Sequence, residues 1–463
     1  MRTMSRRRIK SPLDSLAAVP SVRAAAAALV EAVAREASER VLTAPDYARA
    51  IATMGRLRGR PLLLPAIASG AGRGARVRLA DGTWKLDWIG GIGVYGFGHA
   101  DRDLVETAAI AAASDAVFQG HLLPGPEYAR VSRALLRHAG KRLRHVWLSI
   151  SGAMANENAL KMLLQKRHPA DRLVAFEGNF AGRTTTLAEL TDKAAYREGL
   201  PLRGNVLLVP FYDASDPDPI GRSLAALDAH LHRHPAQIAA MSFELVQGEG
   251  GIRTAPREFF IALMQRCRAA GVAVWIDEVQ TFARTGELFA FRTLALDEWV
   301  DVVTAGKVLQ GSAVLFTKAM NPRPGLVAGT FAGATVGMAV GARIIERLEQ
   351  EGYLGAEGRI ALLGRRVERR FEALARRCEG AVSRYEGIGA MHAFVAFDGK
   401  ADVTNAVVRA AWDEGLFVFT AGASPMRIRL LLPVNTTDEE LEAGFAMLEK
   451  ALRRVGEARE IPC

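Results

Sequence analysis

Residues 274–286 read VWIDEVQTFARTG, and this stretch decides the fold because an apolar run ends abruptly on two carboxylates. The carboxylates belong to Asp277 and Glu278. A continuous apolar run is typical of a strand that is buried on both faces of a sheet. A buried carboxylate is costly without a partner. The strand therefore either opens into a site at its end or runs into a solvated loop.

Apolar runs of the same kind recur on both sides of this stretch, separated by segments with helical periodicity. They are VWLSI, RLVAF, NVLLVP, IAAMSFELV, VDVVTAG and AVLFT, which begin at residues 146, 172, 205, 238, 300 and 313. Buried strands that alternate with helices predict an α/β fold with a mostly parallel central sheet covered by helices. Ligands of such sheets bind beyond the carboxyl ends of the strands. This placement favours an open site at Asp277.

Both ends of the chain mix helices with strands. Residues 20–42 form an Ala-rich stretch that predicts a helix, and an Asp-Gly turn at Asp81 predicts a strand pair. A last helix would begin with a capping box between Thr437 and Glu440. We therefore predict a smaller α+β domain made from the two termini. The predicted divisions are an N-terminal segment 1–85, a large domain 86–335 and a C-terminal part 336–463.

The composition is that of a globular enzyme. The chain has 463 residues, 49% hydrophobic and 24% charged, which is enough for a large core. The formal net charge is +10, but arginines gather only in RRRIK at residues 6–10, so we expect no nucleic-acid partner. Cys267, Cys378 and Cys463 share no metal-ligand spacing, and we expect no metal.

The sequence also bears on the compartment. Sparse cysteines are typical of a reducing environment. No apolar run reaches the length of a membrane helix, and the N-terminus lacks the apolar region of a secretion signal. We expect a cytoplasmic protein that does not contact a membrane.

A second candidate residue, Lys307, follows the predicted strand VDVVTAG. A lysine paired with a buried aspartate suggests pyridoxal phosphate (PLP). The lysine amine forms a Schiff base, and the carboxylate of Asp277 keeps the pyridine nitrogen protonated so that the ring accepts electrons. The phosphate needs a cradle, and SISGAMANENALK at residues 149–161 provides a strand, a Ser-Gly-Ala turn and a helix. Backbone N–H groups at a helix N-terminus bind phosphate, and glycine permits close approach.

At this point the chain resembles the class III (ω-amino acid) aminotransferases of PLP fold type I, from about Val77 to Leu452. The resemblance places it in a divergent subgroup related to the acetylornithine, ornithine and 4-aminobutyrate aminotransferases. Eight segments occur in the family's order, and together they are specific. They are ADGTWKLDWIGGIGVYGFGHADRDLV (80–105), SGAMANENALK (151–161), FEGNFAGRT (176–184), ELVQGEGG (244–251), DEVQTFARTG (277–286), AGKVLQG (305–311), AGTFAGATVG (328–337) and MRIRLLLPVNTTDEEL (426–441).

The resemblance implies roles toward the cofactor. Lys307 would form the Schiff base and then act as acid and base in the 1,3-proton shift, while Asp277 would pair with the pyridine nitrogen. Val279 and Phe180 would pack on the two faces of the ring, and Gln280 would bond its hydroxyl group.

The resemblance also implies a phosphate site and a dimer. Ser151, Gly152 and Ala153 would hold the phosphate, Gly152 and Ala153 through their backbone N–H groups. Thr330 would reach the phosphate in the neighbouring subunit, which implies a homodimer with shared active sites.

The substrate roles are less determined. Arg429 would hold a substrate carboxylate, and Glu244 would mask Arg429 when a substrate without that carboxylate binds. Arg427 lies on the same face of the predicted strand, so either arginine could be the carboxylate site. Ile92 and Tyr95 would line the substrate pocket or pack in the core. We expect Glu249 to shape a turn, although it lies in the same segment as Glu244.

Four departures from the family pattern weaken any transfer of substrate identity. Met154 replaces a Glu in the phosphate loop, and Ala181 replaces the His or Asn after the stacking aromatic. The region after Gln280 is one residue shorter, and the segment after Thr330 lacks Gly-Asn-Pro.

The leading hypothesis is a transaminase that moves the terminal amino group of an ω-amino acid or diamine to a 2-oxo acid such as 2-oxoglutarate, by a ping-pong mechanism. Class III racemases, an aminomutase and decarboxylases share the fold and cofactor, so the alternative is one of those reactions. A basic binding protein without catalysis is the third hypothesis.

Overall fold

The computed structural model of the chain describes residues 15–114 and 122–460. The basic segment at residues 6–10 and Cys463 lie outside these ranges. Within them, no helix combines the length and the apolar character needed to cross a membrane. The cytoplasmic location stays a prediction.

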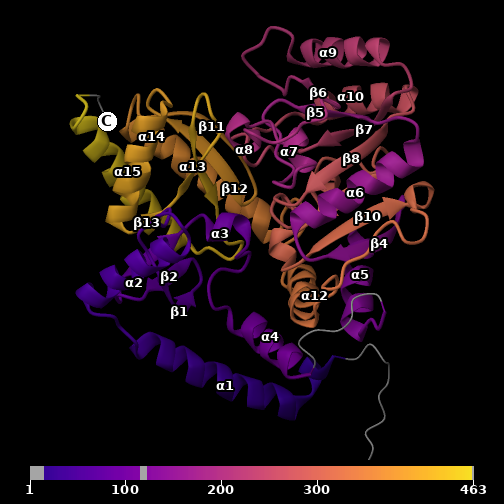
Figure 1. Cartoon of the computed structure of the whole chain (residues 1–463). Helices are drawn as coiled ribbons and strands as arrows, with labels where there is room; N and C mark the ends of the chain where they lie inside the picture. Colours follow the sequence, from indigo (N-terminus) through magenta and orange to yellow (C-terminus); the bar gives the residue numbers. More distant parts are fainter. Residues whose placement is uncertain (1–14, 115–121, 461–463) are drawn as a thin grey trace, which may run out of the picture.

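A seven-stranded sheet forms the centre of the large part of the molecule (Figure 1). Its strands run in the order β4-β10-β9-β8-β7-β5-β6, and β10 alone is antiparallel to its neighbours. The bounds are β4 Leu143–Ser149, β5 Arg172–Phe176, β6 Val206–Val209, β7 Ile238–Phe243, β8 Ala273–Glu278, β9 Val302–Ala305 and β10 Ser312–Thr317. The prediction of an α/β fold with a mostly parallel sheet is confirmed, and each of the seven predicted strands is present.

Helices cover both faces of this sheet, as the strand β8 shows. Ala273 and Trp275 pack in the cluster that contains α6, whereas Val274 and Ile276 pack in the cluster that contains α5 and α10. Alternation of side chains along a strand places these residues on opposite faces. The helices of this part are α5 Pro126–His138, α6 Gly152–Arg167, α7 Leu187–Leu190, α8 Ala194–Arg197, α9 Pro219–Arg233, α10 Arg257–Ala269, α11 Ala290–Thr293 and α12 Thr335–Gln350, with the 3-10 turns η2 Lys307–Leu309 and η3 Lys318–Met320.

The two ends of the chain share a sheet, because the C-terminal strand β13 pairs with the N-terminal strand β3 in parallel. This pairing supports the prediction that the termini form one unit, while the boundaries at residues 85 and 335 stay predictions. One small sheet has the order β1-β2-β3-β13 and the other β11-β12-β15-β14. Their bounds are β1 Ala68–Arg73, β2 Arg76–Leu79, β3 Trp84–Asp87, β11 Val382–Ile388, β12 Met391–Ala396, β13 Leu416–Phe417, β14 Phe419–Ala421 and β15 Arg427–Leu431.

The C-terminal helices pack on these strands. They are α13 Arg359–Arg377, α14 Ala401–Glu414 and α15 Asp438–Glu457. Thr437 and Glu440 form the predicted capping box at the start of α15. Glu440 also accepts a hydrogen bond from the N–H of Ala75 at 3.1 Å, which ties the last helix to the N-terminal sheet.

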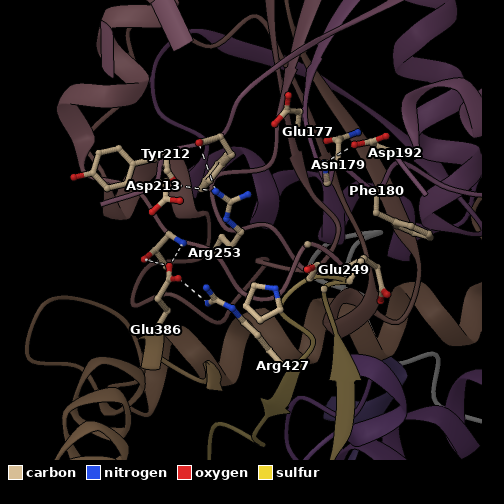
Figure 2. A pocket seen from close by; sticks show the side chains of 18 of the residues that line it. Glu177, Asn179, Phe180, Asp192, Tyr212, Asp213, Glu249, Arg253, Glu386 and Arg427 are labelled. Atoms are coloured by element: carbon tan, nitrogen blue, oxygen red, sulfur yellow. Dashed lines mark hydrogen bonds and ion pairs between the residues drawn. The ribbon is translucent and has the colours of Figure 1, made fainter. Parts of the chain in front are cut away.

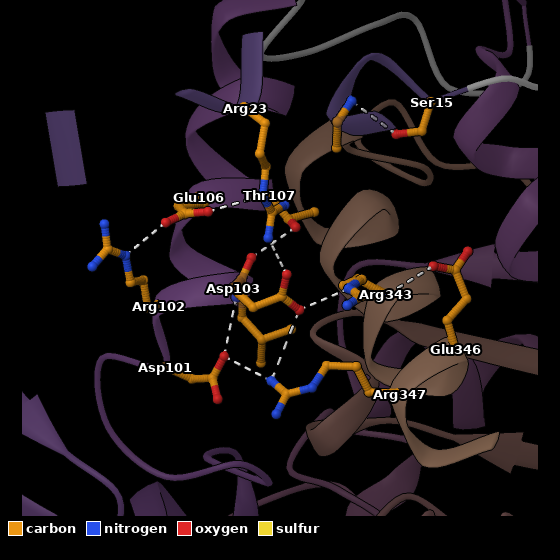
Figure 3. Close-up of polar contacts among 12 residues, drawn as sticks. Ser15, Arg23, Asp101, Arg102, Asp103, Glu106, Thr107, Arg343, Glu346 and Arg347 are labelled. Atoms are coloured by element: carbon orange, nitrogen blue, oxygen red, sulfur yellow. Dashed lines mark hydrogen bonds and ion pairs between the residues drawn. The ribbon is translucent and has the colours of Figure 1, made fainter. Parts of the chain in front are cut away.

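The N-terminal helices are η1 Leu16–Ala18, α1 Pro20–Glu39, α2 Ala44–Leu57, α3 Gly90–Gly93 and α4 Arg102–Ser114. Of these, α1, α2 and α4 lie along one side of the molecule, whereas α3 lies near its centre (Figure 1). Ala26 is the buried residue of α1, so charged contacts rather than a broad apolar face attach this helix (Figure 3). Arg23 bonds Asp103 and lies 2.9 Å from Glu106 on α4, and Arg343 of α12 bonds the other oxygen of Asp103 at 2.7 Å.

Candidate active site

The two carboxylates at the end of β8, those of Asp277 and Glu278, have different hydrogen-bond partners. Asp277 accepts hydrogen bonds from the N–H of Val279 at 2.9 Å and from the side-chain amide of Asn156 at 2.7 Å. Burial raises the pKa of Asp277 to about 6. Glu278 instead accepts bonds from the N–H groups of Ala290 and Phe291, both at 2.9 Å, and so fixes the start of α11. Asp277 is therefore available to the site, and Glu278 is part of the scaffold.

Asn156 is a site residue that the sequence reasoning missed. It lies on α6 one helical turn after Gly152, and its amide also donates to the carbonyl of Ala181 at 2.7 Å. It thereby fixes one oxygen of Asp277 relative to the loop that contains Phe180. A polar side chain one turn after a phosphate cradle, on the same helix face, was the signal that could have identified it.

Lys307 follows β9 after one intervening residue, Gly306, and is the first residue of η2, with a left-handed backbone (φ 51°). Such a conformation is strained for a residue with a side chain and is maintained by the surrounding structure. Burial lowers the pKa of Lys307 to about 7, and the like charges of Arg429 and Arg284 act in the same direction. The carboxylates of Glu249 and Asp277 act against that decrease. A large fraction of the amine is thus neutral near pH 7, as a nucleophile requires.

The N-terminus of α6 forms a cradle beside Val279. Ser151 caps the helix by accepting from the N–H of Met154 at 3.3 Å. The first N–H groups of a helix, here those of Gly152 and Ala153, have no partner within the helix and attract anions. A Cβ on Gly152 would lie 2.6 Å from a methyl of Val279, so glycine is required for this close approach.

Gln280 and Phe180 lie close to the same strand end. The side-chain oxygen of Gln280 is buried without a hydrogen-bond partner among the described residues, and Gly248 leaves the space that it needs. The N–H of Phe180 donates to Glu244 at 2.8 Å. An orphaned buried oxygen has a cost that a bound polar ligand would remove.

The predicted pairing of Glu244 with Arg429 is corrected by the structure. Glu244 accepts hydrogen bonds from the N–H groups of Phe180 and Gly248, and burial next to Asp277 raises its pKa to about 8. The carboxylate that faces Arg429 belongs to Glu249, at 2.8 Å, although we had expected Glu249 to shape a turn. Glu244 turns back onto its own loop, so it cannot mask the arginine in this arrangement.

Arg429 is fully buried, and one edge of its guanidinium is free. Its Nη1 donates to Glu249 and to the carbonyl of Gly248 at 3.3 Å, while Nε and Nη2 have no partner among the described residues. Nε and Nη2 form the edge that binds a carboxylate with two parallel hydrogen bonds. Arg427, two residues earlier, instead bonds Glu386 at 2.6 Å.

The predicted substrate-lining loop is held by a second residue that the sequence reasoning missed. Arg284 is fully buried and donates to the carbonyls of Gly93 at 2.7 Å and Leu432 at 3.2 Å. It therefore links the loop with Ile92 and Tyr95 to the segment that follows β15. Burial lowers the pKa of Arg284 to about 10. Ile92 and Tyr95 are exposed in this chain, at 37% and 44%.

The roles predicted for Tyr95 and Thr330 stay predictions. Tyr95 stacks on His99, and His99 bonds Asp87 at 2.8 Å. Thr330 is exposed in the loop before α12.

A cavity of about 820 Å³ adjoins these groups (Figure 2). Phe180 and Glu249 form one end of its wall, and Arg427, Glu386 and Arg253 form another. The candidate site therefore continues into a cavity that extends beyond Phe180 and Glu249 to Arg427.

A family model described as aminotransferase class-III matches residues 21–452. The chain belongs to the class III aminotransferases. Among curated relatives, the 2-aminoadipate transaminase of Pseudomonas putida is 30% identical over 403 residues, which cover 82% of this chain and 94% of the relative. The acetylornithine aminotransferase of Streptomyces coelicolor is 31% identical over 400 residues, which cover 83% and 91%.

Solved structures of aminotransferases share the fold. A lysine aminotransferase from M. tuberculosis in the internal aldimine form superposes with a TM-score of 0.78 at 24% identity, covering 88% of this chain and 99% of that chain. A Bacillus anthracis aminotransferase gives a TM-score of 0.81 at 19% identity, with 89% and 100% covered. The fold type I prediction is confirmed, and this class III aminotransferase is a PLP-dependent transaminase.

The residues of this chain fit the cofactor. The structure provides a buried lysine amine, a fixed carboxylate at Asp277, an anion cradle at Gly152 and an orphaned oxygen on Gln280. Lys307 would hold the cofactor, and the other groups would bind its nitrogen, phosphate and hydroxyl. These individual roles are proposals.

Proposed function

We propose that this transaminase moves the terminal amino group of an ω-amino acid or diamine to a 2-oxo acid such as 2-oxoglutarate. The observation that supports it is the free Nε/Nη2 edge of Arg429, which is buried beside Glu249 and close enough to Lys307 to affect its pKa. A free cationic edge in a buried site fits the planar carboxylate of a 2-oxo acid.

The proposal gives each residue a task. When bound, the cofactor supplies an electron sink. Asp277 keeps a proton on the nitrogen of the ring, because Asn156 and the N–H of Val279 hold its carboxylate in one orientation. Lys307 holds the cofactor and then moves a proton to and from the substrate carbon, a task suited to an amine with a pKa of about 7.

Glu249 and Arg429 together would let one pocket accept two kinds of substrate. When a donor without a carboxylate at this position binds, Glu249 neutralises Arg429. When a 2-oxo acid binds, its carboxylate replaces that of Glu249, whose side-chain hydrogen bonds within the described residues go to Arg429 alone. This role replaces the one predicted for Glu244.

The proposal includes a homodimer with shared sites. Ile150 and Phe331 are 58% and 53% exposed and line one hollow with Leu309, which lies in the same turn as Lys307. Exposed apolar side chains next to a catalytic lysine are typical of a surface that another chain covers. Thr330, next to Phe331, would then reach the cofactor phosphate of the neighbouring subunit.

Subunit mixing tests the shared site. Lys307→Ala and Thr330→Ala homodimers should both be impaired, and mixing them should restore activity, because one site of each heterodimer then has both residues intact. Failure of the mixture to gain activity would place Thr330 in its own subunit's site or outside the site.

Spectroscopic half-reactions test the transamination itself. The visible band of the bound cofactor should be absent in Lys307→Ala, should bleach with an ω-amine and should return with 2-oxoglutarate. A band that no amine bleaches, together with racemisation of an amino acid, would contradict the proposed function.

A further inference from the structure

We propose that Arg427 forms a second anion subsite that binds the distal carboxylate of a long amine donor. The inference rests on the proposed function, because it names the donor that the same active site would take. The sequence left two donor classes open, an ω-amino acid and a diamine. The proposed subsite favours the ω-amino acid, because this donor ends in a carboxylate.

The position of Arg427 links it to the site. Residues two apart on a strand point to the same face, so Arg427 and Arg429 are neighbours on one side of β15. Arg427 lines the cavity of about 820 Å³ whose wall also includes Phe180 and Glu249 (Figure 2). A ligand that fills this cavity can therefore contact Arg427 together with Phe180 and Glu249 of the candidate active site.

Arg427 is pre-organised for a ligand. It is 7% exposed, and its Nη1 donates to Glu386 at 2.6 Å and to the carbonyl of Gly251 at 3.4 Å. Gly251 has φ 112°, and a Cβ there would lie 3.0 Å from Cδ of Arg427, so glycine makes room for this side chain. The hydrogen bonds of Arg427 within the described residues use Nη1, which leaves its Nε/Nη2 edge available to a carboxylate.

The partner of Arg427 is fixed rather than displaceable. The second oxygen of Glu386 accepts hydrogen bonds from the N–H and the hydroxyl group of Thr254, at 2.7 and 3.1 Å. Glu386 therefore orients the guanidinium and stays in place when a ligand enters. A fixed orientation lowers the entropic cost of binding.

Charged side chains of both signs line this end of the cavity. Arg253 and Arg384 line the same cavity as Arg427, and the carboxylates that act on Arg253 belong to Glu386, Asp213 and Glu177. Arg253 is held by the carbonyl of Tyr212 at 2.9 Å. Three cations face three anions, so this end of the cavity carries no net charge, and the preference for a carboxylate over a second ammonium rests on the free Nε/Nη2 edge of Arg427.

The size of the cavity indicates a long donor. About 820 Å³ is within the range of sites that enclose drug-sized ligands. A short ω-amino acid would leave most of that space to water. The structure thus assigns the donor carboxylate to Arg427 and the 2-oxo acid carboxylate to Arg429, so Glu249 stays paired during the donor half-reaction.

A matched pair of donors tests this assignment. 8-Aminooctanoate and 1,8-diaminooctane have the same length and the same reacting amine but end in opposite charges. We expect the wild-type holoenzyme to prefer 8-aminooctanoate in kcat/KM, mainly through KM. Arg427→Gln should reduce this preference about 10- to 100-fold, the equivalent of one or two charge-assisted hydrogen bonds, and Arg427→Lys should retain part of it.

Arg222→Gln is the matched control, because Arg222 lines the same cavity but is paired with Asp216 at 3.2 Å. It removes the same charge and should leave the preference unchanged. An equal loss in both variants would show general electrostatic attraction and would overturn the subsite. A preference that survives in Arg427→Gln would also overturn it.

A binding measurement separates this inference from the proposed function. We expect 8-aminooctanoate to raise the melting temperature of the wild-type apoenzyme more than that of Arg427→Gln, whereas 1,8-diaminooctane should not distinguish them. If no donor is transaminated but this difference is present, the proposed function fails and the subsite stands. If donors are transaminated but the difference is absent, the subsite fails alone.

Discussion

The two arginine–glutamate pairs on β15 use the same contacts but differ in what holds the glutamate. In each pair Nη1 of the arginine donates to one glutamate oxygen and to a glycine carbonyl. The second oxygen of Glu386 is anchored by Thr254, whereas the side-chain hydrogen bonds of Glu249 within the described residues go to Arg429 alone.

This difference shows that the hydrogen bonds around an ion pair decide whether a ligand can displace one of its two members. Breaking a buried pair is costly when a charge is left without a partner. Glu249 can leave without that cost only when a substrate carboxylate takes its place on Arg429. Glu386 has two further hydrogen bonds to lose, so the Arg427 pair is a fixed element and the Arg429 pair is an exchangeable one.

The largest effect should come from Arg429→Gln. This change removes both free nitrogens of the buried edge, and we expect the half-reaction with 2-oxoglutarate to fall about 10²- to 10³-fold further than the half-reaction with 1,8-diaminooctane. Rapid-mixing spectroscopy of the two half-reactions measures the ratio. Equal losses in both half-reactions would show that Arg429 does not distinguish acceptor from donor.

Glu249→Gln should affect the opposite half-reaction. In this variant no carboxylate neutralises the charge of Arg429 when a diamine binds. We therefore expect the rate of the half-reaction with 1,8-diaminooctane to fall roughly tenfold relative to the rate of the half-reaction with 2-oxoglutarate. Glu386→Gln should leave this ratio within about twofold, because Glu386 belongs to the other pair. A similar change in both variants would remove the distinction between exchangeable and fixed pairs.

The fold and the cofactor site were accessible from the sequence because they depend on local patterns in a set order. Apolar runs locate the strands, and the parallel connections bring Asp277, Lys307 and the cradle at Gly152 to the same edge of the sheet. Asn156 was accessible in the same way, since it lies one turn after Gly152 on α6.

The sequence could not show which of two glutamates in one segment pairs with Arg429. Glu244 and Glu249 both occur in ELVQGEGG, and the decision lies in how the chain turns at Gly248, whose N–H binds Glu244 and whose carbonyl binds Arg429. Arg284 was missed for a related reason. Its acceptors are carbonyls 191 and 148 residues away in the chain, and no local pattern encodes such contacts.

Of the two pairs, the protonation of Lys307 should report on the exchangeable one. Its pKa of about 7 lies below the usual lysine value, so the unfolded chain binds more protons between that pH and about 10.5, and apoenzyme stability should rise with pH in this window. In the apoenzyme, labelling of Lys307 by an amine reagent should have its midpoint near pH 7. Mass spectrometry of the labelled peptide measures it.

Variants of the two pairs should move this midpoint differently. Arg429→Gln removes a like charge and should raise it, and Glu249→Gln removes an opposite charge and should lower it. Arg427→Gln is the control, because the largest charge effects on the pKa of Lys307 come from other groups, Arg429 and Glu249 first among them. A midpoint that moves as far in Arg427→Gln as in Arg429→Gln would contradict the separation of the two pairs.

The smallest effect should be the stability cost of Glu386→Gln. The amide can still accept from Thr254, but it no longer pairs with the charge of Arg427, so we expect a loss of about 1 kcal/mol. Thermal unfolding compared with that of Glu379→Gln measures it, because Glu379 is exposed in the loop between α13 and β11 and forms no ion pair with the residues that the structure describes. If the two variants have the same melting temperature, Glu386 does not stabilise the fold through Arg427. The fixed pair would then contribute no more to stability than the exchangeable pair, and another contact would have to orient Arg427.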